Sequence, residues 1–172
     1  GLDYQIVVAD SSQLDKQIPL LTIEALVKEG LNLEYRQISN DTLYVEKLLG
    51  VLSEVKTKYV ALGADDDFFV PGTLADAIAF LNAHPEYSAF HGKAVAFSVH
   101  EASRTNKIVS TIKYPQRGVE GPTGVERLID SMSNYTTTWY SVHRTDLLYS
   151  NLKMISDVTD DYLLLEMALS NL

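Results

Sequence analysis

Strand-like and helix-like segments alternate through residues 4–100, and this order restricts the fold more than any other feature of the sequence. Short runs rich in β-branched residues are typical of strands, whereas longer runs with apolar residues on one helical face are typical of helices. The expected strands are residues 4–12, 31–38, 58–64 and 87–100, and the expected helices are 18–30, 42–57 and 72–84. This alternation predicts an α/β fold with a mostly parallel sheet and right-handed crossovers.

Local signals support the individual elements. Pro19 suits the start of the first helix and Gly30 suits the position just past its end. Asp41 is expected to cap the second helix. The core-facing residues of the second helix are predicted to be Leu48, Leu52 and Val55, and those of the third Leu74, Ile78 and Leu81. The apolar run at 58–64 predicts a strand that helices cover on both faces.

The pattern is less regular after residue 100. It predicts a strand followed by a Gly- and Pro-rich loop at 107–124, a helix at 125–134, a strand at 136–144 and helices at 146–155 and 159–172. Trp139 is expected to lie in the core. No repeat or linker interrupts the sequence, so we expect one domain, 1–172, with a regular half (1–100) and a less regular half (101–172).

Composition excludes several classes of protein. The net charge is −9, and the basic residues are scattered singly, which argues against a nucleic-acid partner. The absence of cysteine rules out disulfides and cysteine-ligated zinc and fits a reducing compartment, for which we expect the cytoplasm. No apolar run approaches the roughly 20 residues of a membrane span. Walker, G-x-G-x-x-G and G-x-S-x-G motifs are absent.

Acidic residues follow two of the expected strands. Asp10 ends the first, and Asp65, Asp66 and Asp67 stand together after the third. They could be turn residues and helix caps, but three adjacent carboxylates repel one another unless a cation or hydrogen-bond donors are present. Ligands collect at the carboxyl ends of strands in open α/β sheets. The run therefore indicates a divalent cation bound together with a diphosphate. In an extended chain, Asp65 and Asp67 would share one side and backbone amides would hold Asp66 on the other.

A second acidic pair, Asp160-Asp161, opens the last expected helix. Thr159 is a plausible N-cap, and acids in the first turn favour the helix dipole. The same place could instead deliver a general base to the ligand edge of the sheet. The sequence leaves both interpretations open.

Taken together, these segments resemble the family 2 glycosyltransferases, which have the GT-A fold. Residues 4–12 are similar to the family's second strand, which ends in an aspartate that contacts the nucleotide base. Residues 58–74 resemble the strand that carries its D-x-D-type motif, followed by a proline and a helix. Residues 159–169 resemble its Glu-Asp motif at a helix start. The resemblance covers nearly the whole chain in order and spacing.

The resemblance implies a role for each acidic residue. Asp10 would contact the nucleotide. Alignment on Pro71 makes Asp66 and Asp67 the two terminal acids of the motif, with Gly63-Ala64 in place of the family's Leu-Asp. Asp67, with Asp65, would bind a divalent cation, Mn²⁺ or Mg²⁺, and Asp65 and Asp66 would contact the nucleotide.

The resemblance also implies a reaction. Asp161 would be the catalytic base of an inverting enzyme that transfers a sugar from a nucleotide-diphosphate sugar to a hydroxyl of a glycan or other acceptor. Residues 1–100 would bind the donor and 101–172 the acceptor.

One departure from the family concerns the beginning of the chain, where the family's first strand and helix have no counterpart. We therefore expect an exposed sheet edge, which favours self-association, and weak or absent activity of this chain alone. Two other functional classes compete with the transferase. A related module could hold a nucleotide or glycan without turnover, and a nucleotidyltransferase would show a Gly-rich phosphate loop, which is not seen.

Overall fold

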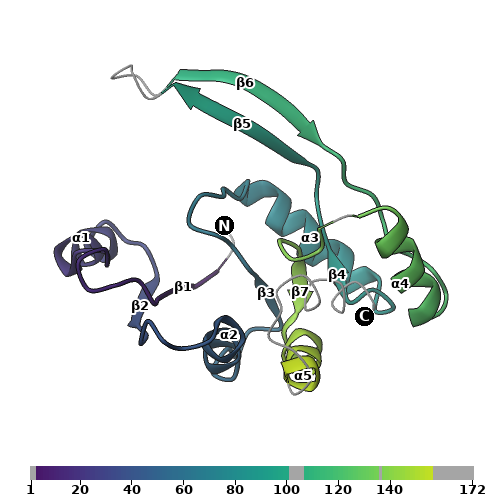
Figure 1. Ribbon diagram of the computed structural model, residues 1–172, viewed down its shortest axis with the longest axis horizontal. Coiled ribbons are helices and arrows are strands. Elements are labelled where there is room, and N and C mark those ends of the chain that lie inside the picture. The colour runs from purple at the N-terminus through teal and green to yellow at the C-terminus, as the bar shows by residue number, and fades with distance from the viewer. Residues whose placement is uncertain (1–2, 101–106, 136, 157–172) are drawn as a thin grey trace.

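The computed structural model describes residues 3–100, 107–135 and 137–156, and within them it contains seven strands and five helices. The strands are β1 (Ile6–Asp10), β2 (Leu33–Gln37), β3 (Tyr59–Ala61), β4 (Ala89–Phe90), β5 (Ala94–His100), β6 (Lys107–Tyr114) and β7 (Val142–Arg144). The helices are α1 (Leu20–Lys28), α2 (Tyr44–Leu52), α3 (Pro71–Ala83), α4 (Gly124–Ser133) and α5 (Thr145–Ser156). The predicted alternation of strands and helices in the first half is confirmed (Figure 1).

The sheets are smaller and more antiparallel than predicted. β1 pairs with β2 in parallel, but β7 pairs antiparallel with both β3 and β4, and β5 pairs antiparallel with β6. β3 and β4 therefore run in the same direction, as a βαβ unit requires, but the late strand β7 lies between them. The expectation of a mostly parallel sheet is wrong for the described residues, because this insertion replaces parallel pairs with antiparallel ones.

Helices cover both faces of the β3–β7–β4 sheet. On one face Val60 of β3 packs with the α2–α5 cluster of Val45, Leu52, Trp139, Leu148 and Leu152. On the other face Tyr59, Ala61 and Val142 pack against Ala77 and Leu81 of α3. The alternation along β3 sends neighbouring side chains to opposite layers, as a strand must. Trp139 is 2% exposed and belongs to the core, as predicted.

The β1–β2 pair is less enclosed. Asp10 is its one buried residue, and α1 buries none of its side chains. Within the described residues no ladder joins β1 to β3, so each has one edge without a strand partner. Among these residues, no helix has the length and apolar character needed to cross a membrane.

The start of α2 differs from the prediction. The N-cap is Leu43, which makes no side-chain capping hydrogen bond, and α2 ends at Leu52. Asp41 instead accepts a hydrogen bond from the Ser39 hydroxyl. The expected cap is wrong because this local bond engages the carboxylate one turn before the helix begins. Leu48 and Val55 nevertheless pack on the α2–α5 cluster, as expected.

Arg144 joins β7 to the end of α3. Its guanidinium donates hydrogen bonds to the carbonyl oxygens of Tyr87, Leu81 and His84 at 2.8, 2.6 and 3.1 Å. It also lies over the ring of Tyr59, 5.7 Å from the centroid. This half-buried side chain therefore adds hydrogen bonds to carbonyl oxygens at the carboxyl end of α3 and in the turn that follows, where the His84 oxygen also accepts from the Tyr87 amide at 3.2 Å.

We expect Arg144→Ala to lower the free energy of unfolding by about 3 kcal/mol, because several charge-assisted hydrogen bonds disappear together. Arg144→Lys should recover less than half of this loss, since an ammonium lacks the planar fork. Urea denaturation measures both. Lys153→Ala, at an exposed position of α5, is the control and should stay within about 0.5 kcal/mol of wild type. An equally small effect for Arg144→Ala would contradict the assignment.

Candidate functional site

The carboxyl ends of β1 and β2 form a polar corner. β1 ends at Asp10 and β2 at Gln37, and the loops that follow them lie side by side because the two strands are parallel and in register. The Ile38 amide donates to the Asp10 carbonyl oxygen at 2.8 Å and extends the pairing by one step. Two segments that are far apart in the sequence thus meet at one edge.

Asp10 organises the loop after β1. Its Oδ1 accepts a hydrogen bond from the Ser12 amide at 2.9 Å, and its Oδ2 accepts from the Ile18 amide at 3.2 Å and the Tyr35 hydroxyl at 2.9 Å. The hydrogen bonds from Ser12, Tyr35 and Ile18 lower the pKa of Asp10 to about 2, with the Ser12 amide contributing most and burial opposing the shift. Asp10 is therefore an anion that holds residues 11–18 in place.

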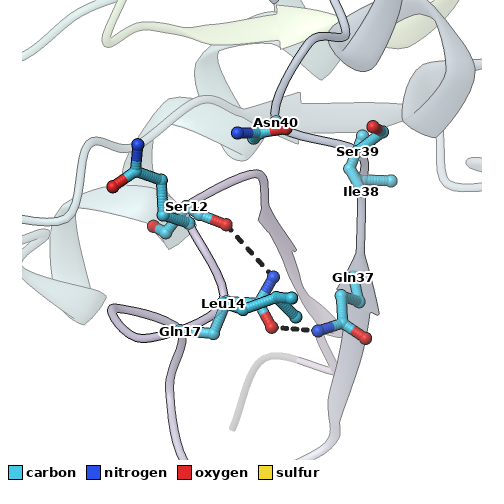
Figure 2. Close-up of a pocket in the computed structure, with 8 residues that line it drawn as sticks. Ser12, Leu14, Gln17, Gln37, Ile38, Ser39 and Asn40 are labelled. Carbon is cyan, nitrogen blue, oxygen red and sulfur yellow. Dashed lines mark hydrogen bonds between the residues drawn. The ribbon is translucent and has the colours of Figure 1, made fainter.

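A cavity of about 370 Å³ opens between these two loops (Figure 2). Its lining residues are mostly polar and uncharged: Ser12, Gln13, Leu14, Gln17, Gln37, Ile38, Ser39 and Asn40. The side-chain amide of Gln17 connects the two loops. It donates a hydrogen bond to the Ser12 carbonyl oxygen at 3.1 Å and accepts one from the side-chain amide of Gln37. Amides that both donate and accept suit a ligand such as a nucleobase or ribose, which offers both kinds of group.

Lys47 brings a positive charge to this corner from α2. Its Nζ donates to the Ser11 hydroxyl at 2.8 Å, one residue from Asp10, and its ammonium is 5.7 Å from the centroid of the Tyr44 ring. Lys47, Gln17 and Tyr35 were not predicted as site residues, because no motif in the sequence marks them. An ammonium held at a strand end is suited to a phosphate oxygen.

The three aspartates lie in the exposed loop between β3 and α3. The chain turns at Asp65 and Asp66, and the Asp67 amide donates to the Ala64 carbonyl oxygen at 3.5 Å. The segment is therefore not extended, and the predicted alternation of Asp65 and Asp67 against Asp66 does not apply. A Cβ on Gly63 would lie 3.0 Å from the Phe69 ring, so a residue without a side chain lets this ring fold back on the strand end.

The carboxylates of this loop are exposed and converge on no preformed centre. In residues 3–100, 107–135 and 137–156, no group of three or more His, Cys, Asp or Glu side chains is placed to hold a metal ion. Mg²⁺ and Mn²⁺ are nevertheless commonly bound by one or two carboxylates, with substrate phosphates and water completing the coordination. Such a cation fits the chemistry of this loop.

A second cavity lies in the less regular half of the chain. It measures about 570 Å³ and is lined by Lys113, Pro115, Gln116, Arg117, Asn134 and Tyr135. The His91 ring is 3.0 Å from the Arg117 carbonyl oxygen, which ties this cavity to the carboxyl end of β4. Asp160 and the predicted base Asp161 lie outside the described residues.

Asp10→Asn should lower the free energy of unfolding by about 2 kcal/mol at neutral pH, because a charged acceptor of three hydrogen bonds is lost. The folded-state pKa of about 2 lies below the ordinary value of 3.8. The stabilisation is thus present above pH 3.8 and is lost as the pH falls through about 2. Denaturation of wild type and variant between pH 2 and 7 measures it.

The exposed neighbour Asp15 serves as control. Asp15→Asn removes the same charge from the same loop and should change stability by less than about 0.5 kcal/mol. A difference between wild type and Asp10→Asn that stays constant down to pH 2 would contradict the role of the carboxylate charge.

Comparison with known proteins identifies a fold but no family. No protein-family model matches the sequence, and no curated protein matches it. A solved structure, TarS 1–349 from S. aureus, matches with a TM-score of 0.54 and 22% sequence identity. The match covers 97% of this chain and 44% of the TarS chain. TarS is a glycosyltransferase, and the likeness shows that this chain shares its fold over the matched part.

Proposed function

We propose that this chain contains the donor-binding part of a metal-dependent glycosyltransferase of the GT-A type, related to family 2. The observation that carries this proposal is the run Asp65–Asp67 directly after β3, in a chain whose fold is glycosyltransferase-like. A polar cavity at the ends of β1 and β2 supplies a second binding region. The donor is a nucleotide-diphosphate sugar, and the acceptor is a hydroxyl of a glycan or another molecule.

Each part of the donor has a proposed partner in the chain. The cavity between the loops after β1 and β2 takes the base or ribose, and Asp10 contacts it through Oδ1, which also accepts the Ser12 amide. Asp65 and Asp66 lie toward the nucleotide, and Lys47 offers an ammonium to a phosphate oxygen.

Asp67 and Asp65 would hold a divalent cation, whose bound charge stabilises the leaving diphosphate. The negative charge of these carboxylates would also repel a diphosphate without a cation, so the donor would bind together with its metal ion. Asp161 would accept the proton of the attacking hydroxyl in an inverting transfer. The less regular half, with its cavity near Arg117, would hold the acceptor.

Among the residues that the structure describes, β1 and β3 each have one edge without a strand partner, and these edges support a further part of this proposal. A strand between them would join the two sheets into one, and either another part of the protein or a second copy would supply it. This chain spans 44% of the length of TarS 1–349. We therefore expect weak or absent turnover from residues 1–172 alone.

A screen of nucleotide sugars tests the proposal. Binding of UDP-, GDP-, CDP- and dTDP-sugars is measured by calorimetry with Mn²⁺ and again with excess EDTA. We expect one nucleotide class to bind in Mn²⁺ and to lose most of its affinity in EDTA. No binding in either condition would overturn the proposal. Binding without hydrolysis or transfer of the sugar would favour the alternative, a non-catalytic nucleotide-binding module.

A further inference from the structure

The β5–β6 hairpin stands away from the helices and the central sheet (Figure 1). Isolated two-stranded hairpins are marginally stable in water at best, so a hairpin of this length requires apolar contacts with another group. The hairpin exposes large apolar side chains, among them Val95 (59%), Phe97 (43%) and Ile112 (69%). Contiguous exposed apolar surfaces are typical of binding sites.

The pairing register separates these side chains into two faces. Val95, Phe97 and Val99 alternate along β5 and share one face with their partners on β6, which are Lys113, Thr111 and Ile108. We name the four apolar residues of this face, Val95, Phe97, Val99 and Ile108, the Phe97 face. Ile112 pairs with Ala96 and so belongs to the opposite face. Phe97 and Ile112, which lie on opposite faces of one hairpin, are therefore matched positions for substitution.

The Phe97 face joins the aspartate loop. The ring of Phe97 lies 6.0 Å from that of Phe68, centroid to centroid, and the two planes are tilted by 36°. Phe68 follows Asp67 directly and is 79% exposed, while Phe69 is folded back on Gly63. The apolar surface thus continues from the hairpin to the residue next to the proposed metal-binding carboxylate.

The shape of this surface suits a narrow apolar group. Val95 to Val99 spans about 13 Å along the strand, and the two strands of a hairpin lie about 4.8 Å apart. A standard protein–protein interface buries roughly 800 Å² on each partner, which needs a broader surface than one face of two strands. A single alkyl or aryl group fits these dimensions better than a folded partner does.

We propose that the Phe97 face and Phe68 bind the apolar aglycone of the acceptor, which places the acceptor among alkyl- or aryl-linked hydroxyl compounds. This inference rests on the proposed function, since it assumes that the hydroxyl is glycosylated beside Asp65–Asp67. The polar end of such an acceptor lies toward the carboxylates, and its apolar end lies along the β5–β6 hairpin, so the acceptor site includes β5 as well as the less regular half of the chain.

Binding of hexyl β-D-glucoside and methyl β-D-glucoside, measured by ligand-observed NMR titration without nucleotide or metal, tests the proposal. Wild type should bind the hexyl compound at least about ten-fold more tightly, since burial of two methylene groups corresponds to roughly that factor. Phe97→Ser should remove this preference, whereas Ile112→Ser should keep it within about two-fold. Phe97→Leu should restore most of it, which separates lost contact from lost folding.

Three results would overturn the proposal: equal affinity of wild type for the two glucosides, an equal loss in Phe97→Ser and Ile112→Ser, or a loss that Phe97→Leu does not restore. Two further measurements identify other occupants. A dimer of wild type that Phe97→Ser converts to a monomer, seen by light scattering, would make the face an interface between copies. Sedimentation with anionic phosphatidylglycerol vesicles that Phe97→Ser abolishes would make it a membrane contact. Because the titration contains no donor, its failure is distinct from failure of the nucleotide-sugar screen.

Discussion

Asp67→Asn is expected to lower the Mn²⁺-dependent affinity for a nucleoside diphosphate by at least 10–100-fold. Even indirect partners of a bound metal produce losses of that size, and Asp67 is proposed as a direct ligand. The substitution keeps the size of the side chain and removes its charge, and we expect it to leave folding intact because Asp67 lies in an exposed loop. Calorimetric titrations of UDP and GDP, with Mn²⁺ and with EDTA, give the two affinities.

Asp76→Asn is the matched control for this experiment. Asp76 is an exposed acid in the first half of α3, so its replacement removes the same charge close to the same loop. It should leave the Mn²⁺-dependent affinity within about two-fold, because a screened surface charge has a small effect. If Asp67→Asn and wild type bind equally in Mn²⁺, Asp67 is not a ligand.

The elements that the sequence predicts well are those with strong local periodicity. Leu74, Ile78 and Leu81 recur at helical spacing and all pack on the central sheet in α3. Gly30 has a positive φ of 97°, which a residue after a helix end often adopts and which favours glycine. Both features depend on neighbours within a few residues, so the local sequence contains the information.

Strand pairing was harder to predict because it depends on distant residues. β7 has three residues, and nothing in its own sequence indicates that it lies between β3 and β4. The predicted strand at 136–144 was too long, because Trp139 precedes β7 and turns into the α2–α5 cluster. No pattern in the sequence marks Arg144, at the end of β7, yet its guanidinium donates to three carbonyl oxygens at the end of α3 and in the turn that follows.

The candidate site also contains some residues that a local sequence pattern predicts and others whose role depends on distant segments. Asp10 and Asp65–Asp67 were identifiable because acids at strand ends form a pattern in the sequence. The residues that line the cavity near Asp10 come from two loops that are separate in the sequence, and the amides among them are common surface residues. Gln17 and Gln37, for example, meet only because β1 and β2 are adjacent. Their role follows from the pairing of the strands.

Asp161→Asn is expected to lower turnover by about 10²–10⁴-fold with donor binding unchanged, if Asp161 removes the acceptor proton. The residue lies outside the described part of the structure, so this prediction depends on the family resemblance. A purely structural acid in the first turn of a helix predicts a different result: a loss of about 0.3–1 kcal/mol of stability with turnover nearly intact. Steady-state kinetics and urea denaturation of the same variant therefore separate the two roles.

Asp160→Asn is the internal control, because it removes the same charge one residue away, and a side chain at that position points in another direction on a helix. The kinetics require a form of the protein whose wild type transfers sugar, identified beforehand by the nucleotide-sugar screen. In that form, a large loss for Asp161→Asn and a small one for Asp160→Asn would assign the base. Near-normal turnover of Asp161→Asn would place the base elsewhere, and Asp157→Asn would be the next variant to measure, since it is the preceding acid in the chain.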